Sequence, residues 1–193
     1  MSKPENQEAK RAAILEAGRK AFQKWGLSKT TMEDIAREAG KGKSTLYYYY
    51  KTKEEIFDAL LRVEMGALLS RAKESVLEVN SARERLRRYV TGLVSELSNT
   101  QPLCEILRTE ITERPNSLKK MMEEFESGEV RFVQDTLGVG VRQNQFGFAN
   151  DREQEAMAEA ILRIIRAIEL DLVVAGYDSE YVEKAARIIA NGV

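Results

Sequence analysis

The chain has 193 residues and a formal net charge of −1 at pH 7, with 30 Lys or Arg against 31 Asp or Glu. It has no histidine and a single cysteine, Cys104. These counts exclude intrachain disulfides, cysteine-rich zinc sites and Ser-His or Cys-His nucleophile pairs. No apolar run approaches a membrane span, and the N-terminus lacks the apolar core of a signal peptide. We therefore expect a cytoplasmic protein that is not an enzyme, with no catalytic residue, metal site or cofactor.

The charges are distributed unevenly along the chain. Residues 1–53 hold 12 Lys or Arg against 6 Asp or Glu, whereas residues 54–193 hold 18 against 25. A basic N-terminal part on an acidic remainder attracts phosphate locally without making the whole protein basic. This asymmetry predicts two domains, 1–53 and 54–193, and points to nucleic acid as a partner of the first.

Helices are the expected elements throughout, because the chain has only three prolines and no long alternating strand pattern. The first predicted helix covers residues 9–25, has Phe22 and Trp25 on its apolar stripe, and ends at Gly26. Residues 1–8 are expected to be a solvated, disordered tail. The alternative is a basic arm that reaches phosphate or the minor groove through Lys3, Lys10 and Arg11.

The stretch that follows, TTMEDIAREAGKGKSTLYYYYKTKEEIF, covers residues 30–57. Thr30 and Glu33 have the spacing of a capping box at the start of a second helix, and Gly40 ends that helix. A third helix is expected to begin near Ser44 or Thr45. Two short helices joined by a glycine-containing turn form a helix-turn-helix, and Thr52 with Glu55 caps a fourth helix from residue 53.

The predicted helix after the turn carries a cation, hydroxyls and phenols, with no carboxylate before Glu54. Four consecutive tyrosines circle a helix, so they cannot all be core; Tyr50 is expected inside with Leu46. The outward side chains suit phosphate oxygens and base edges. We expect base-edge contacts from Lys43, Ser44 and Tyr49, and phosphate contacts from Thr31, Thr45, Tyr47 and Tyr48.

The string AGKGKSTLYYYYKTKEE resembles the N-terminal motif of TetR-type (TetR/AcrR) transcriptional regulators, which commonly reads AGVSKGTLYYHFKSKE. The resemblance covers residues 11–57 and implies that Lys53 clamps a phosphate, as the family's lysine does there. Three residues depart from the motif. Lys41 replaces a packed valine of the turn, Tyr49 replaces a frequent histidine and changes the donor offered to DNA, and Tyr50 replaces a frequent phenylalanine.

Residues 54–193 continue as helices, and their pattern predicts an all-α protein of about nine helices. The expected segments after the helix 53–79, which the resemblance makes the link to a regulatory body, are 82–97, 103–112, 117–141, 152–175 and 179–190. Ser81 and Asp151 are expected caps. The arginine row Arg83, Arg85, Arg87 and Arg88 is expected to be a solvated face with one or two acidic partners, rather than a nucleic-acid patch.

The helix predicted at 152–175 is apolar on more than one side, so one side is free for a partner chain. A single helix-turn-helix covers few base pairs, so such proteins usually dimerise and read two half-sites of a palindrome. The resemblance places the dimer interface in the last two helices. We expect contributions to core or interface from Ile161, Ile165, Ile168, Leu172, Ile188 and Ile189.

Methionines and aromatics in the middle of the chain are typical of an adaptable apolar pocket, although plain core packing is the alternative for each residue. The candidates are Met65, Leu69, Tyr89, Leu93, Cys104, Leu107, Met121, Met122, Phe125 and Val133. The resemblance supports the pocket. It implies a homodimeric repressor on a double-stranded DNA operator, released by a small, largely apolar effector. Activation, a helical small-molecule carrier and a protein–protein adaptor with a non-functional DNA-binding part remain alternatives.

Overall fold

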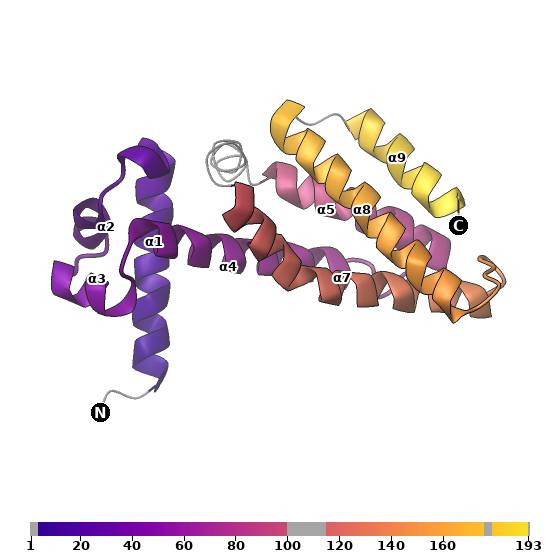
Figure 1. The fold of residues 1–193 in the computed structure, drawn as a ribbon, viewed down its shortest axis with the longest axis horizontal. Helices are drawn as coiled ribbons and strands as arrows, with labels where there is room; N and C mark the ends of the chain where they lie inside the picture. Colours follow the sequence, from indigo (N-terminus) through magenta and orange to yellow (C-terminus); the bar gives the residue numbers. More distant parts are fainter. Residues whose placement is uncertain (1–3, 100–114, 176–178, 193) are drawn as a thin grey trace. The chain divides into compact units, whose positions relative to one another are not determined.

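The structure, a computed structural model, describes residues 4–99, 115–175 and 179–192, and these residues are all-α (Figure 1). The helix predicted at 103–112, with Cys104 and Leu107, lies outside these ranges. Eight helices are described: α1 (Pro4–Lys29), α2 (Met32–Glu38), α3 (Lys43–Tyr49), α4 (Lys53–Glu74), α5 (Ala82–Asn99), α7 (Pro115–Arg142), α8 (Asp151–Ala175) and α9 (Ser179–Asn191).

The chain forms two compact units, residues 1–65 and residues 66–193, which we call the head and the body. The boundary falls inside α4, later than the division at residue 53 expected from charge. The first half of α4 belongs to the head because Ile56 and Phe57 are completely buried there. The ring of Phe57 meets that of Phe22 edge-on at 5.5 Å, which fixes α4 against α1.

Helix α1 begins at Pro4, so residues 4–8 are helical and the predicted disordered tail is wrong for them. The predicted break at Gly26 is confirmed, since this residue has non-helical angles (φ 75°, ψ 164°) inside α1. Thr30 does not cap α2. Its hydroxyl is buried and donates to the Gly26 carbonyl at 2.6 Å, closing the end of α1. The cap falls to the next residue, Thr31.

In the body, α5 packs against α7, α8 and α9. Ser81 caps α5 as predicted, accepting from the Glu84 amide at 3.3 Å. The predicted cap Asp151 is wrong, because the Asn150 side chain accepts from the Glu153 amide at 3.0 Å and Asp151 is already helical. Before α8 the chain turns closely over α7. A Cβ on Gly140 would overlap the buried ring of Phe146, so only glycine fits there.

Two arginines of the α5 row, Arg87 and Arg88, pair with acidic side chains, as expected. The other two, Arg83 and Arg85, donate to backbone carbonyls, which was not expected. Arg83 donates to the backbone carbonyls of Ala190 at 2.5 Å and Gln145 at 2.6 Å, joining α5 to the end of α9. Arg85 donates to the Val79 carbonyl at 2.8 Å. The row therefore fastens helix and loop ends within the body.

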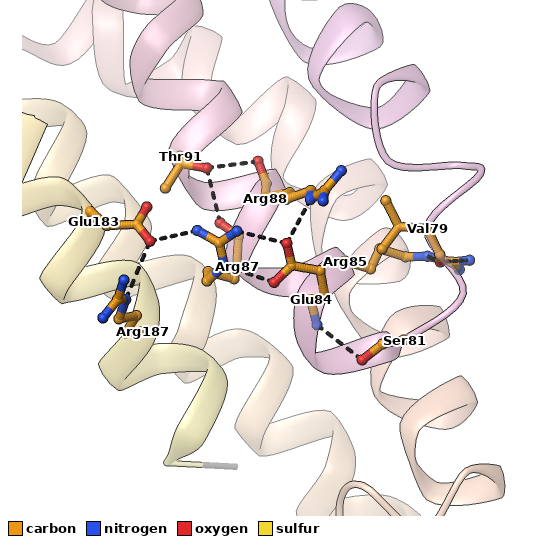
Figure 2. A network of polar contacts seen from close by, with 9 residues as sticks. All are labelled: Val79, Ser81, Glu84, Arg85, Arg87, Arg88, Thr91, Glu183 and Arg187. Carbon is orange, nitrogen blue, oxygen red and sulfur yellow. Dashed lines mark hydrogen bonds and ion pairs between the residues drawn. The ribbon is translucent and has the colours of Figure 1, made fainter.

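A charged network continues from this row to α9 (Figure 2). Glu84 accepts from Arg87 and Arg88, both at 2.6 Å, and Arg87 also donates to Glu183 of α9 at 2.5 Å. The two guanidinium groups lower the pKa of Glu84 to about 2. Glu183 accepts in turn from Arg187 at 3.3 Å. The network links α5 with α9 by side chains as well as by apolar packing.

A second polar cluster lies inside the body, where α5, α7 and α8 meet. Tyr89 donates to the fully buried carboxylate of Glu129 at 3.2 Å. Arg166 donates to Glu129 and, at 2.6 Å, to Glu169. Burial raises the pKa of Glu169. Paired and hydrogen-bonded charges of this kind tolerate burial, whereas loss of one partner is strongly destabilising.

The Glu84 network makes stability depend on pH. Its folded pKa of about 2 lies below the ordinary 4.5, so its contribution is present above pH 4.5 and is lost as pH falls towards 2. We expect Glu84→Gln to lower the free energy of unfolding by about 1 kcal/mol at pH 7, because the pairs are partly screened by solvent. Urea denaturation should show this difference shrinking between pH 5 and about pH 2.

The control is Glu123→Gln, which removes a longer and more exposed pair with Lys119 at 3.8 Å. It should cost less than about 0.5 kcal/mol at either pH. A Glu84→Gln effect that is independent of pH would assign the loss to packing instead of charge.

Candidate nucleic-acid interface

Helix α3 buries one of its seven side chains, Leu46, which is completely enclosed. The others face solvent wholly or in part. Tyr48 is 69% exposed and Tyr47 is 41% exposed. The prediction that the tyrosines cannot all face inward is thereby confirmed, and α3 offers four exposed side chains to a partner, those of Lys43, Ser44, Tyr47 and Tyr48.

The turn before α3 is set by backbone geometry. Gly40 adopts φ 60°, in the left-handed region, and its amide donates to the Arg37 carbonyl at 3.1 Å. The Lys41 amide donates to the Ala36 carbonyl at 3.0 Å, which completes a Schellman motif. The Lys41 side chain is exposed, so its departure from the family's valine leaves this turn intact. Helix α3 then starts earlier than predicted, with Gly42 as N-cap in place of Ser44 or Thr45.

The end of α3 is fixed by the residues after it. Tyr50 leaves the helix in an extended conformation (φ −139°, ψ 133°) and is 7% exposed, so its burial anchors the C-terminus. The Lys51 ammonium donates to the Tyr47 carbonyl at 2.8 Å, satisfying an acceptor that the helix leaves open. Both ends of α3 are therefore held while its sides stay accessible.

Of the three candidates for base-edge contacts, Lys43 and Ser44 are exposed and Tyr49 is half-buried. Lys43 forms an ion pair with Glu33 of α2, which lowers the pKa of that carboxyl. Both partners are largely exposed, at 61% and 47% of their side chains, so the pair is easily displaced. The Tyr49 ring meets Tyr48 edge-on at 5.0 Å.

The candidates for phosphate contacts differ in how free they are. Thr45 is half-exposed, and Tyr47 and Tyr48 are exposed. Thr31 forms a capping box with Asp34, and its hydroxyl proton is donated to the Asp34 carboxylate at 2.6 Å. This hydroxyl is thus already committed as a donor, and its bond lowers the pKa of Asp34.

Lys53 is the most constrained of the predicted contacts. Its ammonium donates to three backbone carbonyls, those of Leu27 at 2.8 Å, Ser28 at 2.9 Å and Thr30 at 2.9 Å. An ammonium has three protons, so a phosphate contact would replace one of these bonds. In this geometry Lys53 joins α4 to the end of α1 inside the head.

Arg11 of α1 also lies beside the end of α3, whereas the sequence suggested a role for it only in a basic arm. Its guanidinium is 5.6 Å from the centre of the Tyr49 ring and 5.8 Å from that of Tyr50. No local signal connects residues this far apart in the chain. Glu33 was likewise missed as a neighbour of Lys43, because capping assigned it to the start of α2.

The pocket candidates of the body are mostly interior. Among the described ones, Leu69, Tyr89, Leu93, Met121 and Val133 are buried, and Met122 and Phe125 are half-buried. Met65 is buried as well but belongs to the head unit. Cys104 and Leu107 lie outside the described residues.

The candidates for core or dimer interface on α8 and α9 fall into a buried group and an exposed residue. Five are buried in their own chain, namely Ile161, Ile165, Ile168, Leu172 and Ile189. Ile188 is 73% exposed. Sequence reasoning missed four other exposed apolar residues on α8 and α9, which are Ile164, Leu170, Val174 and Tyr181. They are the second apolar side that the pattern of α8 indicated without residue assignment.

The described helices include none with the length and apolar character of a membrane span. In the same part of the chain, no group of three or more His, Cys, Asp or Glu could hold a metal ion.

Removing the Lys53 ammonium leaves three carbonyls without their shared donor. We expect Lys53→Met, which keeps the apolar stem, to lower the free energy of unfolding by about 1.5–3 kcal/mol, the scale of hydrogen bonds to a charged group. The measurement is urea denaturation followed by fluorescence of Trp25, the single tryptophan, which lies in the head. The control Lys51→Met loses one carbonyl contact and should cost clearly less. Equal losses for the two variants would contradict the anchoring role.

Known proteins share both this head and this fold. Residues 14–60 match the family described as bacterial regulatory proteins, tetR family. The chain is 32% identical over 164 residues to the HTH-type transcriptional regulator TtgR of Pseudomonas putida, covering 81% of this chain and 77% of that one. It is 24% identical over 132 residues, 68% of each chain, to the fatty acid metabolism regulator protein of Bacillus subtilis.

Among solved structures, the regulator FadR from Bacillus subtilis in complex with stearoyl-CoA superposes with a TM-score of 0.73 at 20% identity, covering 94% of this chain and 98% of that one. This likeness shows the fold. The identity to TtgR extends well beyond the helix-turn-helix, over most of both chains. The chain therefore belongs to the tetR family of bacterial regulatory proteins, as a helix-turn-helix transcriptional regulator.

Proposed function

We propose that the protein is a homodimeric, effector-responsive repressor that binds a palindromic operator in duplex DNA through α3. The observation that carries this proposal is the exposure of α3, which buries only Leu46 and offers Lys43, hydroxyls and phenols to solvent. Such a helix fits the major groove, where these groups donate to base edges and phosphates. The surplus of basic residues in positions 1–53 supports the approach of this unit to DNA.

A second copy of the chain is the proposed occupant of the outer face of α8 and α9. Five large apolar side chains there are at least 48% exposed: Ile164, Leu170, Val174, Tyr181 and Ile188. Tyr181 and Ile188 are seven residues apart and so lie on one side of α9. A helical regulator with one reading helix per chain needs a partner to span two half-sites, and an apolar face on its last helices supplies the surface.

The proposed effector is a small, largely apolar molecule. The body's interior is mainly aliphatic and aromatic, and the half-buried Met122 and Phe125 are adaptable lining groups. The FadR structure that superposes on this chain is a complex with stearoyl-CoA, a molecule whose acyl part is a long apolar chain. Binding would lower operator affinity by favouring a dimer whose heads no longer match the half-site spacing.

The position of the operator relative to a promoter decides between repression and activation.

A carrier or adaptor with an inactive head is the competing function, and it predicts no operator. The first experiment is therefore selection of bound sequences from random duplex DNA with the purified protein and no added ligand. An enriched palindrome supports the proposal and gives the half-site spacing. Weak binding without enrichment, vanishing as salt rises, favours the carrier or adaptor.

Lys43 is expected to read sequence. Lys43→Ala should relax the preference at particular base pairs by about 1–3 kcal/mol, the scale of one bidentate base contact. Operator variants measured by fluorescence anisotropy test this. The matched control is Lys20→Ala, since Lys20 is also an exposed lysine facing a carboxylate of α2, Glu38. Equal losses on operator and random DNA would reassign Lys43 to the phosphate backbone.

Ile188 is expected to lie in the dimer interface. Ile188→Glu should leave the fold intact, because the side chain is 73% exposed, yet convert dimers to monomers and sharply weaken operator binding. Light scattering after size-exclusion chromatography measures the mass. Leu77→Glu is the control, since Leu77 is 61% exposed but lies between α4 and α5. A dimer that survives Ile188→Glu would remove α9 from the interface.

A further inference from the structure

Arg11 of α1 contacts two tyrosine rings at the end of α3. Its guanidinium lies within 6 Å of two ring centres, at 5.6 Å from Tyr49 and 5.8 Å from Tyr50. These distances are within the range of cation–π attraction. Arg11 comes from α1, whereas the two rings belong to the end of α3 and to its C-cap. The contact therefore joins the first helix of the head to the exit of the reading helix.

The two rings differ in burial. Tyr50 is 7% exposed and is held by the core of the head, so it provides a fixed base for the guanidinium. Tyr49 is half-buried and also meets the edge of the Tyr48 ring at 5.0 Å, with the planes 87° apart. Contacts with Arg11 and Tyr48 together restrict the rotation of the Tyr49 ring about its side-chain bonds. Its hydroxyl is then held in one direction.

We propose that Arg11 is a specificity-determining positioning residue, which orients the Tyr49 hydroxyl towards a base edge by fixing its ring. The inference rests on the proposed function, since it concerns the same DNA-reading surface. A phenol on an exposed helix otherwise loses side-chain freedom when it binds, and a ring fixed beforehand avoids this cost. Arginine suits the role because its planar guanidinium stacks on aromatic faces and is more weakly hydrated than an ammonium.

A direct phosphate contact is the rival role for Arg11, and the two roles respond differently to substitution. A positioning residue acts through Tyr49, so its removal affects the operator more than random DNA. A phosphate contact acts on any sequence and contributes about 0.9 to the salt slope. The hydroxyl of Tyr49 is the group that separates them, because Tyr49→Phe keeps the ring beside Arg11 and removes the hydrogen bond.

The test is a double-mutant cycle in the full-length protein, with Arg11→Gln, Tyr49→Phe and the pair combined. Affinity for the selected operator and for a scrambled duplex is measured by fluorescence anisotropy over a salt series. We expect Arg11→Gln to weaken operator binding two- to fivefold, the scale of one exposed cation–π contact, with the scrambled duplex unchanged. In the Tyr49→Phe background, Arg11→Gln should have no further effect. The melting temperature of the Arg11→Gln variant should match that of the unmodified protein, because Arg11 is exposed.

Two results would overturn the inference. One is an equal loss on both duplexes with a shallower salt slope, which makes Arg11 a phosphate contact. The other is full additivity of the two substitutions on the operator, which disconnects Arg11 from the Tyr49 hydroxyl. Failure of the proposed function looks different, since the unmodified protein would then select no operator. Lys20→Gln is the control variant, because it removes another exposed cation of α1, one that pairs with Glu38, and it should leave operator affinity unchanged.

Discussion

The head is built around one constraint: a helix that reads DNA must keep its sides free, so it cannot be held by them. Helix α3 buries only Leu46, and one side chain cannot fix the position of seven residues. The structure holds its ends instead. At the start, Gly40 and the Lys41 amide close a Schellman turn from α2. At the exit, the buried Tyr50 and the carbonyl contact of Lys51 fix the last turn. The reading surface is thus held at both ends and still exposed.

In the body, polar side chains connect the helices at two places, one at the surface and one in the interior. The network of Glu84, Arg87 and Glu183 lies at the surface, where each pair contributes little alone and several charges share partners (Figure 2). The cluster of Glu129 and Arg166 is buried, where a broken pair leaves an uncompensated charge. The first joins α5 to α9 and the second joins α7 to α8. A body held in this way resists sliding of its helices, because apolar packing alone has little directional preference.

The sequence predicted the all-α class, the helix-turn-helix and most helix limits, because apolar periodicity and glycine stops are local signals. The sequence-based prediction was wrong where two adjacent residues could both cap the same helix. Thr30 and Thr31 are both good caps, and the choice depends on the buried Thr30 hydroxyl, which donates back to the Gly26 carbonyl and so is not available to α2. The contacts of Arg83 and Arg87 with α9 were missed because their partners there, Ala190 and Glu183, are about a hundred positions away. Periodicity also placed Ile165 and Ile188 in one group, although burial separates them completely.

Two lysines at the ends of the reading region show why position in a motif does not determine role. Both Lys43 and Lys53 match the family's lysines, and both were expected to contact DNA. Lys43 has a single carboxylate partner in solvent, and exchanging that partner for a base edge costs little. The Glu33 carboxylate also orients the ammonium before DNA arrives. Lys53 donates all three protons to carbonyls that terminate α1, and two of these bonds are partly buried. A phosphate contact would replace one of these bonds and leave that carbonyl without its Lys53 donor. These contacts support Lys43 as the proposed base-reading cation and make Lys53 the lysine that joins α4 to the end of α1.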